Sequence, residues 1–341
     1  MNNQISIIGG GSWGTAIAQV IAGNGHQVLI HVRDKIQKTS INKNNENHKY
    51  FPGFQLSKNI RATTSLEKTV EFADVIFLAI PTYVTRKIIY DIKNILTDEK
   101  VLVSTAKGIE EKTFYRNSQI INNNLENPVV VLSGPTHAEE VIKGLPSAAV
   151  VACKEKKHAK KIQEIMMSSR FRVYTNPDIN GVEVGGAIKN IIAIAAGIAD
   201  GLGYGDNTRA ALVTRGLHEM SRLGVELGGE ILTFAGLTGM GDLVVTCTSM
   251  HSRNRRLGIN IGEGLSLDDS VKEVNQTVEG IRTTKAIYEW YHNNEYKFDI
   301  PITKQIYKVL FQEKNPFRAV EDLMLRGPKH EIAEVVQVLD W

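Results

Sequence analysis

Two lysines of this 341-residue chain stand where a cation could take part in a reaction. Lys189, followed by Asn190, lies in an apolar stretch with helical spacing, so its side chain either reaches solvent along the helix or points into a cleft. Desolvation in a cleft would lower its pKa toward neutrality, where an amine acts as a general acid or base. Lys107 follows an apolar run that predicts a strand, and open α/β sheets bind ligands at the carboxyl ends of their strands. Two such cations suit the reduction of a carbonyl group, whose oxygen needs a positive field and a proton.

Polar residues further along the chain offer partners for a lysine and for an anionic substrate. Asp242, in a glycine-rich motif, has the charge needed to hold a lysine in place. Ser252, Arg253 and Asn254 form a compact group of donors suited to a phosphate, although the same residues also fit a solvated, basic helix end.

A loop at residues 133–139 follows another predicted strand and offers a further set of contacts. Gly134 would let the backbone approach a ligand closely, and Thr136 adds a hydroxyl group. This loop is therefore a second candidate for the substrate site.

The first residues of the chain predict a dinucleotide-binding turn. A G-x-G-x-x-G sequence formed by Gly9, Gly11 and Gly14 follows a predicted strand at 5–8 and opens a predicted helix at 15–22. The first glycine permits the tight turn, the second lets the backbone approach a pyrophosphate, and the third lets the helix pack against the sheet. The free N–H groups of the helix N-terminus favour the phosphates.

The end of the next strand should read the 2′ position of the adenosine ribose. Asp34 lies 20 residues after Gly14 and suits a 2′-hydroxyl, which favours NAD, whereas Arg33 suits a 2′-phosphate, which favours NADP. Both residues are present, so the preference stays open. The guanidinium of Arg33 inclines us toward NADP.

The elements that must position these residues alternate between short apolar runs and helical patterns. This rhythm predicts an N-terminal Rossmann domain with a doubly wound sheet, because parallel strands covered on both faces are apolar throughout. Thr64 or Ser65 is expected to cap a helix, and 42–53 is expected to be a loop. The predicted strands are 5–8, 28–31, 75–79, 101–104, 129–132 and 148–152.

The pattern changes near residues 175–182. From 182 onward helical spacing and glycine-rich turns dominate, so a mainly helical C-terminal domain is predicted. We divide the chain into an NAD(P)-binding domain at 1–178 and a substrate and catalytic domain at 179–341, with a last short helix at 321–325.

Composition limits the class of protein. The net charge of +3 is too balanced for bulk nucleic-acid binding. Two cysteines without a CxxC motif, and nine histidines without an HxxxH or HExxH pair, predict neither a disulfide framework nor a metal site. The N-terminus resembles a strand rather than a signal peptide, and the most apolar stretch, 187–199, is too short to span a bilayer. A soluble, cytoplasmic protein is expected.

Several ordered motifs resemble those of a known family, the bacterial-type NAD(P)-dependent glycerol-3-phosphate dehydrogenases. The resemblance extends from about residue 5 to about residue 312. It implies reversible reduction of dihydroxyacetone phosphate to sn-glycerol 3-phosphate with NADPH or NADH, which supplies glycerophospholipid synthesis. The motifs are GGGSWGTA (9–16), YFPG (50–53), AKGIE (106–110), SGPTHAEEV (133–141), GAIKNIIAIAAGIADGLGYGDNTRAALVTRG (186–216), GLTGMGDLVVTC (236–247), SRNRRLG (252–258) and VEGIRT (278–283).

The resemblance also implies roles for individual residues. Lys189 takes the place of the catalytic lysine, and Lys107 and Arg253 take places near both cofactor and substrate. Three positions depart slightly from the family: Thr136, Met240 and Ala106 replace a frequent serine, leucine and serine. The other cofactor positions are Gly9, Gly11, Ser12, Trp13, Gly14, Arg33, Tyr50, Ala138, Val278 and Glu279, and the other substrate positions are Gly134, Thr136, Asn190, Asp242, Ser252 and Asn254.

Two alternative functions fit part of the pattern. A 6-phosphogluconate or β-hydroxyacid type dehydrogenase also joins a Rossmann domain to a helical domain with a catalytic lysine. The Ser252–Asn254 cluster and the Gly236–Asp242 motif favour a triose phosphate instead. A non-catalytic NAD(P)H sensor would usually carry a DNA-reading module, and the sequence contains no helix-turn-helix or basic stripe. We expect no nucleic-acid partner and no stable membrane insertion, with a homodimer as the candidate assembly.

Overall fold

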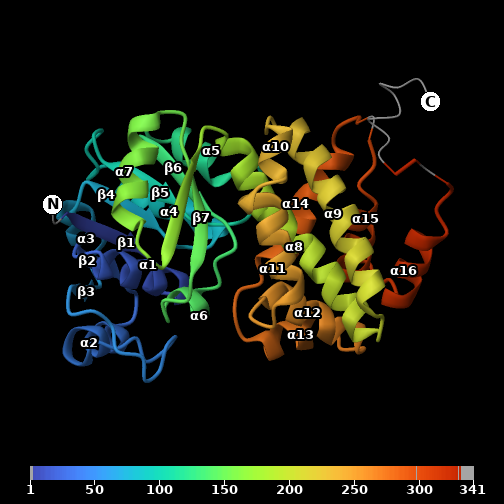
Figure 1. The fold of residues 1–341 in the computed structure, drawn as a ribbon, viewed down its shortest axis with the longest axis horizontal. Coiled ribbons are helices and arrows are strands. Elements are labelled where there is room, and N and C mark those ends of the chain that lie inside the picture. Colours follow the sequence, from blue (N-terminus) through green and yellow to red (C-terminus); the bar gives the residue numbers. More distant parts are fainter. Residues whose placement is uncertain (1–2, 297, 329, 332–341) are drawn as a thin grey trace.

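The computed structural model describes residues 3–296, 298–328 and 330–331. A β-sheet with flanking helices forms the N-terminal part, and a bundle of helices forms the C-terminal part beside it (Figure 1). The fold class expected from the sequence is confirmed.

The described strands form one eight-stranded sheet in the order β3-β2-β1-β4-β5-β6-β7-β8. All neighbours are parallel except β6 and β7, which are antiparallel. The strands are β1 (Gln4–Ile8), β2 (Gln27–His31), β3 (Ile60–Thr63), β4 (Val75–Leu78), β5 (Val101–Ser104), β6 (Val129–Ser133), β7 (Ser147–Ala152) and β8 (Phe171–Asn176).

The prediction of six parallel strands is wrong in two respects. The strands β3 and β8 were missed, because each alternates buried and exposed residues while the prediction followed continuous apolar runs. In β8, Phe171 and Val173 are buried, whereas Arg172 and Tyr174 are exposed. The apolar run of β7 was found, but such a run carries no information on strand direction.

The helices of the N-terminal part cover the sheet and follow the expected rhythm. The Ser65 hydroxyl accepts a 3.1 Å bond from the Lys68 backbone N–H and so caps α3, as predicted. The loop expected at 42–53 begins later, because α2 continues to Asn44. These helices are α1 (Ser12–Gly23), α2 (Lys35–Asn44), α3 (Leu66–Phe72), α4 (Thr82–Ile92), α5 (Asn117–Asn122), α6 (Ala138–Val141) and α7 (Lys156–Met166).

The C-terminal part is helical throughout its described residues. The last helix begins at Pro316, five residues before the predicted start, since Asn315 accepts a 3.3 Å bond from the Arg318 N–H and proline suits the first helical position. The elements are α8 (Ile179–Gly201), α9 (Asp206–Glu226), α10 (Ile231–Phe234), the π-helical turn η1 (Leu237–Gly241), α11 (Asp242–Thr248), α12 (Arg253–Gly262), α13 (Leu267–Val274), α14 (Glu279–His292), α15 (Pro301–Phe311) and α16 (Pro316–Met324).

The helix α8 is the central helix of this bundle. It has 23 residues and extends beyond the apolar stretch 187–199 on both sides, so the prediction that this segment is too short to span a bilayer is wrong on length. Two helical stretches of the described chain, Ile179–Gly201 and Ile231–Thr248, are long and apolar enough to cross a membrane by length and composition alone. The most apolar part of α8 is entirely buried within the protein, as in the core helix of a soluble protein.

Glycines let α8 and α12 pack backbone to backbone. Gly197 and Gly201 of α8 face Gly258 and Gly262 of α12, and no side chain separates the two helices at these positions. A Cβ atom on Gly258 would lie only 2.2 Å from the Ile194 carbonyl oxygen. We call these four glycines the glycine seam. The seam brings the N-terminal end of α12 close to the middle of α8.

Candidate active site

The turn between β1 and α1 has the shape of a dinucleotide cradle. Gly9 has a φ of +117°, a conformation that favours glycine. A Cβ on Gly14 would lie 1.9 Å from the Gly9 carbonyl oxygen, so only glycine fits there. Gly11 precedes α1 with no side-chain cap, and a Cβ on it would meet no atom within 4 Å. The N–H groups of this helix end therefore face open space that suits a pyrophosphate.

Two further features beside this turn fit a bound dinucleotide. The indole Nε1 of Trp13 is buried without a hydrogen-bond partner, and a buried donor of this kind needs an acceptor. The Asn47 side-chain amide donates to the Gly10 carbonyl (3.1 Å) and to the Thr15 hydroxyl (2.7 Å), and the backbone carbonyl of Asn47 accepts the Tyr50 N–H (3.1 Å). The Tyr50 loop is thus tied to the glycine turn, as its cofactor assignment requires.

The two candidate readers of the ribose differ in their availability. One oxygen of Asp34 accepts a 2.7 Å bond from the Ile36 N–H and caps α2, so half of this carboxylate is already engaged. The side chain of Arg33 is exposed. This arrangement favours the arginine as the reader of the 2′ position.

The side chains expected at the reacting centre meet around Asp242. Lys189 Nζ donates to one Asp242 oxygen and to the Thr246 hydroxyl at 2.9 Å. Lys107 Nζ donates to the other Asp242 oxygen at 2.8 Å and to the Gly134 carbonyl at 2.7 Å. Lys189 is only 5% exposed, so its side chain does not reach solvent along the helix. The alternative in which Lys189 reaches solvent is therefore wrong, and its side chain points toward Asp242 and Thr246 instead.

The electrostatics of this cluster match proton transfer near neutral pH. Burial is the largest cause that lowers the pKa of Lys189, the charge of Lys107 lowers it as well, and Asp242 opposes both, so that the resulting pKa is about 7. Burial alone would raise the pKa of Asp242, but the two lysines outweigh burial and hold that pKa below its usual range. The carboxylate thus stays charged, while the Lys189 amine is poised to gain or lose a proton.

A chain of buried amide groups joins this centre to α12. The Asn190 amide donates to the Lys107 carbonyl at 3.1 Å. Asn254 donates to Asn190 Oδ1 at 2.9 Å and accepts the Gly280 N–H at 2.9 Å. These hydrogen bonds fix the N-terminal residues of α12 and α14 relative to α8.

The N-terminal end of α12 supplies a positive site. Ser252 caps the helix, because its hydroxyl oxygen accepts the Arg255 N–H at 3.2 Å, and its own proton remains available as a donor. Arg253 is exposed, and no ion-pair partner for it is found among the described residues. With Asn254 alongside, this end of the helix has the donors for a phosphate.

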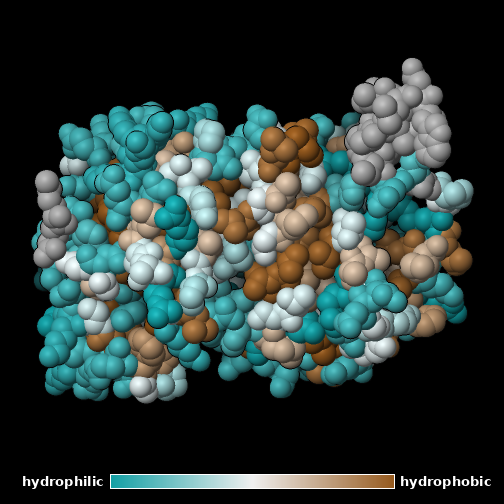
Figure 2. Space-filling model, in the orientation of Figure 1, coloured by the Kyte–Doolittle hydropathy of each residue, from teal (hydrophilic) through white to brown (hydrophobic). Residues whose placement is uncertain are grey.

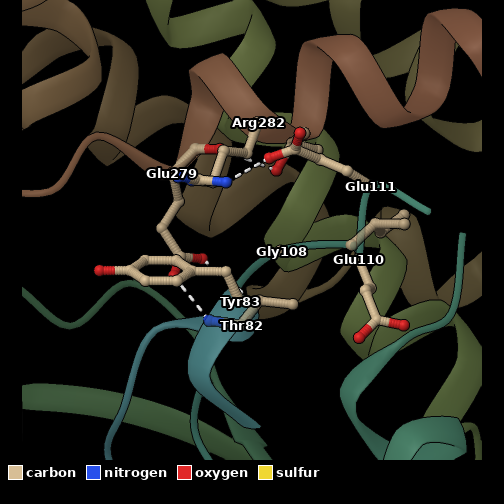
Figure 3. Close-up of a pocket in the computed structure, with 9 residues that line it drawn as sticks. Thr82, Tyr83, Gly108, Glu110, Glu111, Glu279 and Arg282 are labelled. Carbon is tan, nitrogen blue, oxygen red and sulfur yellow. Dashed lines mark hydrogen bonds and ion pairs between the residues drawn. The ribbon is translucent and has the colours of Figure 1, made fainter. Parts of the chain in front are cut away.

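The start of α14 contacts the sheet part of the molecule (Figure 3). The Glu279 carboxylate points toward Thr82 and accepts its backbone N–H at 3.1 Å and its hydroxyl at 3.4 Å. Burial raises the pKa of Glu279, against the opposing effects of the Thr82 bond and the Arg253 charge. Thr82 and Glu279 line a pocket together with Arg282 and Glu111, and the last two residues form an ion pair at 2.5 Å. Glu279 therefore lies where both parts of the chain meet.

The remaining expected site residues lie at the edges of these groups. Gly134 has a φ of +138°, and the Thr136 hydroxyl donates to the Gly134 carbonyl at 3.2 Å. Ala138 begins α6, Ser12 begins α1, and Val278 precedes α14. No contact among the described residues links Arg33 or Tyr50 to the lysine cluster, which leaves them at the nucleotide end.

Sequence reasoning missed Thr246 and Glu183. Thr246 lies four residues after Asp242, a spacing that places both on one face of a helix, so this signal was available. Glu183 is buried on α8, but its partners lie more than 60 residues away and leave no local pattern.

Among the described residues, no group of three His, Cys, Asp or Glu is placed to hold a metal. Burial raises the pKa of the Cys247 thiol to about 12.

Comparisons with known proteins agree with this geometry over nearly the whole chain. Residues 4–159 match the family model of the NAD-dependent glycerol-3-phosphate dehydrogenase N-terminus, and residues 178–321 match that of the C-terminus. The chain is 64% identical to glycerol-3-phosphate dehydrogenase [NAD(P)+] of Halothermothrix orenii, covering 100% of both chains. It is 51% identical to the Clostridium botulinum protein of the same name, covering 97% of this chain and 99% of the relative. The crystal structure of glycerol-3-phosphate dehydrogenase from Coxiella burnetii superposes with a TM-score of 0.91 at 35% identity, covering 95% of this chain and 99% of that one.

Proposed function

The chain belongs to the NAD-dependent glycerol-3-phosphate dehydrogenase family, and we propose that its hydride transfer is carried out by the side chains gathered around Lys189 and Asp242. It is an NAD(P)-dependent oxidoreductase that reversibly reduces dihydroxyacetone phosphate to sn-glycerol 3-phosphate. The product supplies the glycerol backbone of glycerophospholipids.

The buried lysine pair carries the proposed mechanism. When bound, NAD(P)H supplies the hydride that reaches the ketone carbon. Lys189 donates a proton to the developing alkoxide, and in the reverse direction it removes that proton. Lys107 adds a second positive charge near the same oxygen, while Asp242 holds both ammonium groups in place. A pKa of about 7 suits both directions.

Activity of the purified protein tests the function directly. Adding dihydroxyacetone phosphate to enzyme and NADPH should consume NADPH and yield sn-glycerol 3-phosphate in equal amount. Reduction of NADP+ by 6-phosphogluconate or by a β-hydroxyacid, with no reaction of dihydroxyacetone phosphate, would instead favour the related dehydrogenase class. Tight NADPH binding without turnover of any of these would favour a sensor.

Arg253 is assigned to the phosphate of the substrate. Replacing it by alanine should raise the KM for dihydroxyacetone phosphate by roughly 10- to 100-fold, since a hydrogen bond to a charged group contributes about 1.5–3 kcal/mol. The turnover number should change much less, because ground-state binding is what is lost. Steady-state kinetics with each substrate varied in turn measure both effects. An unchanged KM together with a large drop in kcat would contradict the assignment.

Arg33 is proposed as the reader of the 2′-phosphate, which makes NADPH the preferred cofactor. Replacing Arg33 by alanine should lower kcat/KM for NADPH by about tenfold or more, with little change for NADH, because only NADPH loses a charge-assisted bond. Arg61→Ala is a matched control, since this exposed arginine lies on the neighbouring strand β3, before its carboxyl end. Equal losses for both cofactors would show that Arg33 does not read the phosphate.

We propose that residues 1–178 form the cofactor domain and 179–341 the substrate domain, with cytoplasmic location. The exposed apolar side chains over α10, η1 and α11 support a homodimer (Figure 2). These residues are Ile231, Leu232, Met240 and Val244.

A further inference from the structure

Glu183 is a buried carboxylate of α8 with no role in the mechanism above. It is 5% exposed, and one of its oxygens accepts the Arg116 guanidinium at 2.7 Å and the Ser118 hydroxyl. Its other oxygen accepts the Ser118 backbone N–H at 2.8 Å. A buried ion pair of this kind is weak evidence for stability, because desolvation offsets much of the attraction. The geometry that the pair imposes is its more direct effect.

The partners of Glu183 form the base of a hairpin that begins at Lys107. An isolated antiparallel bridge joins Ile109 to Arg116, so Arg116 pairs with a residue that lies two positions after Lys107. The Asn117 amide also donates to the Gly108 carbonyl at 3.3 Å. Both ends of the segment 107–118 are thus held together at its base.

Two residues of α8 hydrogen-bond to this base. Glu183 binds the Arg116–Ser118 end, and Asn190 donates to the Lys107 carbonyl at 3.1 Å. These two residues are seven positions apart, which is about two helical turns, so they project from the same face of α8. From this base the Lys107 side chain extends to the Gly134 carbonyl and to Asp242.

We propose that Glu183 is a positioning residue for hydride transfer, acting through Arg116 and Ser118 to hold Lys107 at the reacting centre. The inference rests on the proposed function of the lysine cluster. Glu183 itself touches neither Lys189 nor Asp242. It fixes the segment that supplies the second cation.

A double-mutant cycle with Lys107 tests this role. Replacing Glu183 by glutamine keeps the shape but removes the charge that binds Arg116, and it should lower kcat by roughly 10- to 100-fold. In a Lys107→Met background the same change should cost less than about threefold, since no cation remains to be displaced. Equal losses in both backgrounds would overturn the proposal.

The pH profile gives a readout that a purely structural role would not move. Reduction needs protonated Lys189, so its kcat falls as pH rises through the pKa of that lysine. The charge of Lys107 lowers that pKa, and its displacement in E183Q should shift the fall to higher pH. An unshifted profile with only a lower melting temperature would assign Glu183 to stability alone.

Two further variants keep the test decisive. Glu219→Gln removes another buried carboxylate, one that binds the Ile302 and Thr303 N–H groups at 2.9 Å, and it should leave the profile unshifted. If E183Q does not fold, Ser118→Ala removes the hydroxyl that donates to Glu183 and accepts from Arg116 at 2.9 Å, but it keeps the Arg116–Glu183 ion pair. This variant should give a smaller shift in the same direction; no shift would count against the proposal. Failure of the proposed function would instead appear as a wild-type protein without turnover.

Discussion

Replacing Lys189 by methionine is expected to lower kcat for dihydroxyacetone phosphate reduction by about 10²- to 10⁴-fold, the usual contribution of a general acid. Methionine nearly preserves the volume of the buried side chain but cannot donate a proton. The fold should survive, because Asp242 keeps Lys107 as a partner at 2.8 Å. Turnover with both substrates saturating, with circular dichroism as a check on folding, measures the effect.

An exposed lysine serves as the comparison for this prediction. Lys161→Met changes a lysine on the surface of α7 and should leave kcat within about twofold of the wild type, as most surface substitutions do. If Lys189→Met lost less than about tenfold in kcat, Lys189 would not be the proton donor. Lys107 would then be the next candidate, as the other lysine bound to Asp242.

Replacing Gly258 by alanine is expected to have the second large effect, on both stability and substrate binding. The added Cβ would lie 2.2 Å from the Ile194 carbonyl oxygen and 2.8 Å from the Ile198 nitrogen, both backbone atoms that cannot turn away. The two helices must separate, which should cost about 3 kcal/mol of unfolding free energy, near the upper end for overpacking. The N-terminal end of α12 would move with the helix, so the KM for dihydroxyacetone phosphate should rise.

The sign of this effect makes it diagnostic. Alanine in an unconstrained helix position stabilises by about 1 kcal/mol relative to glycine, so propensity alone predicts a gain. Gly23→Ala is the matched control, since a Cβ on this glycine of α1 meets no atom within 4 Å and should give no loss. Urea unfolding of both variants separates the two contributions. A stable Gly258→Ala protein would contradict the description of the glycine seam.

Features that depend on neighbouring residues could be predicted from the sequence. The dinucleotide turn needs glycine at Gly9 and Gly14 for reasons of local backbone shape, and both were found. Lys189 was singled out because a cation in an apolar helix is unusual, although its direction stayed open. The candidate site residues could thus be identified from the sequence, without the fold.

Features that depend on distant pairings could not be predicted. The direction of β7 is set by how the chain returns to the sheet, and nothing in its apolar run records that path. Lys107 and Asp242 are 135 residues apart, so their contact exists only once both parts of the chain are folded. The partners of Glu183 are equally remote. Contacts between such distant residues can be identified only from the three-dimensional structure.

The imbalance of two lysines against one carboxylate links substrate affinity to the proton concentration. With a pKa of about 7, Lys189 is only partly protonated in neutral solution before any substrate arrives. A phosphate dianion entering the site favours the charged amine, so binding takes up a fraction of a proton from the buffer. In the proposed mechanism, substrate binding therefore helps to protonate Lys189, the residue assigned to protonate the substrate.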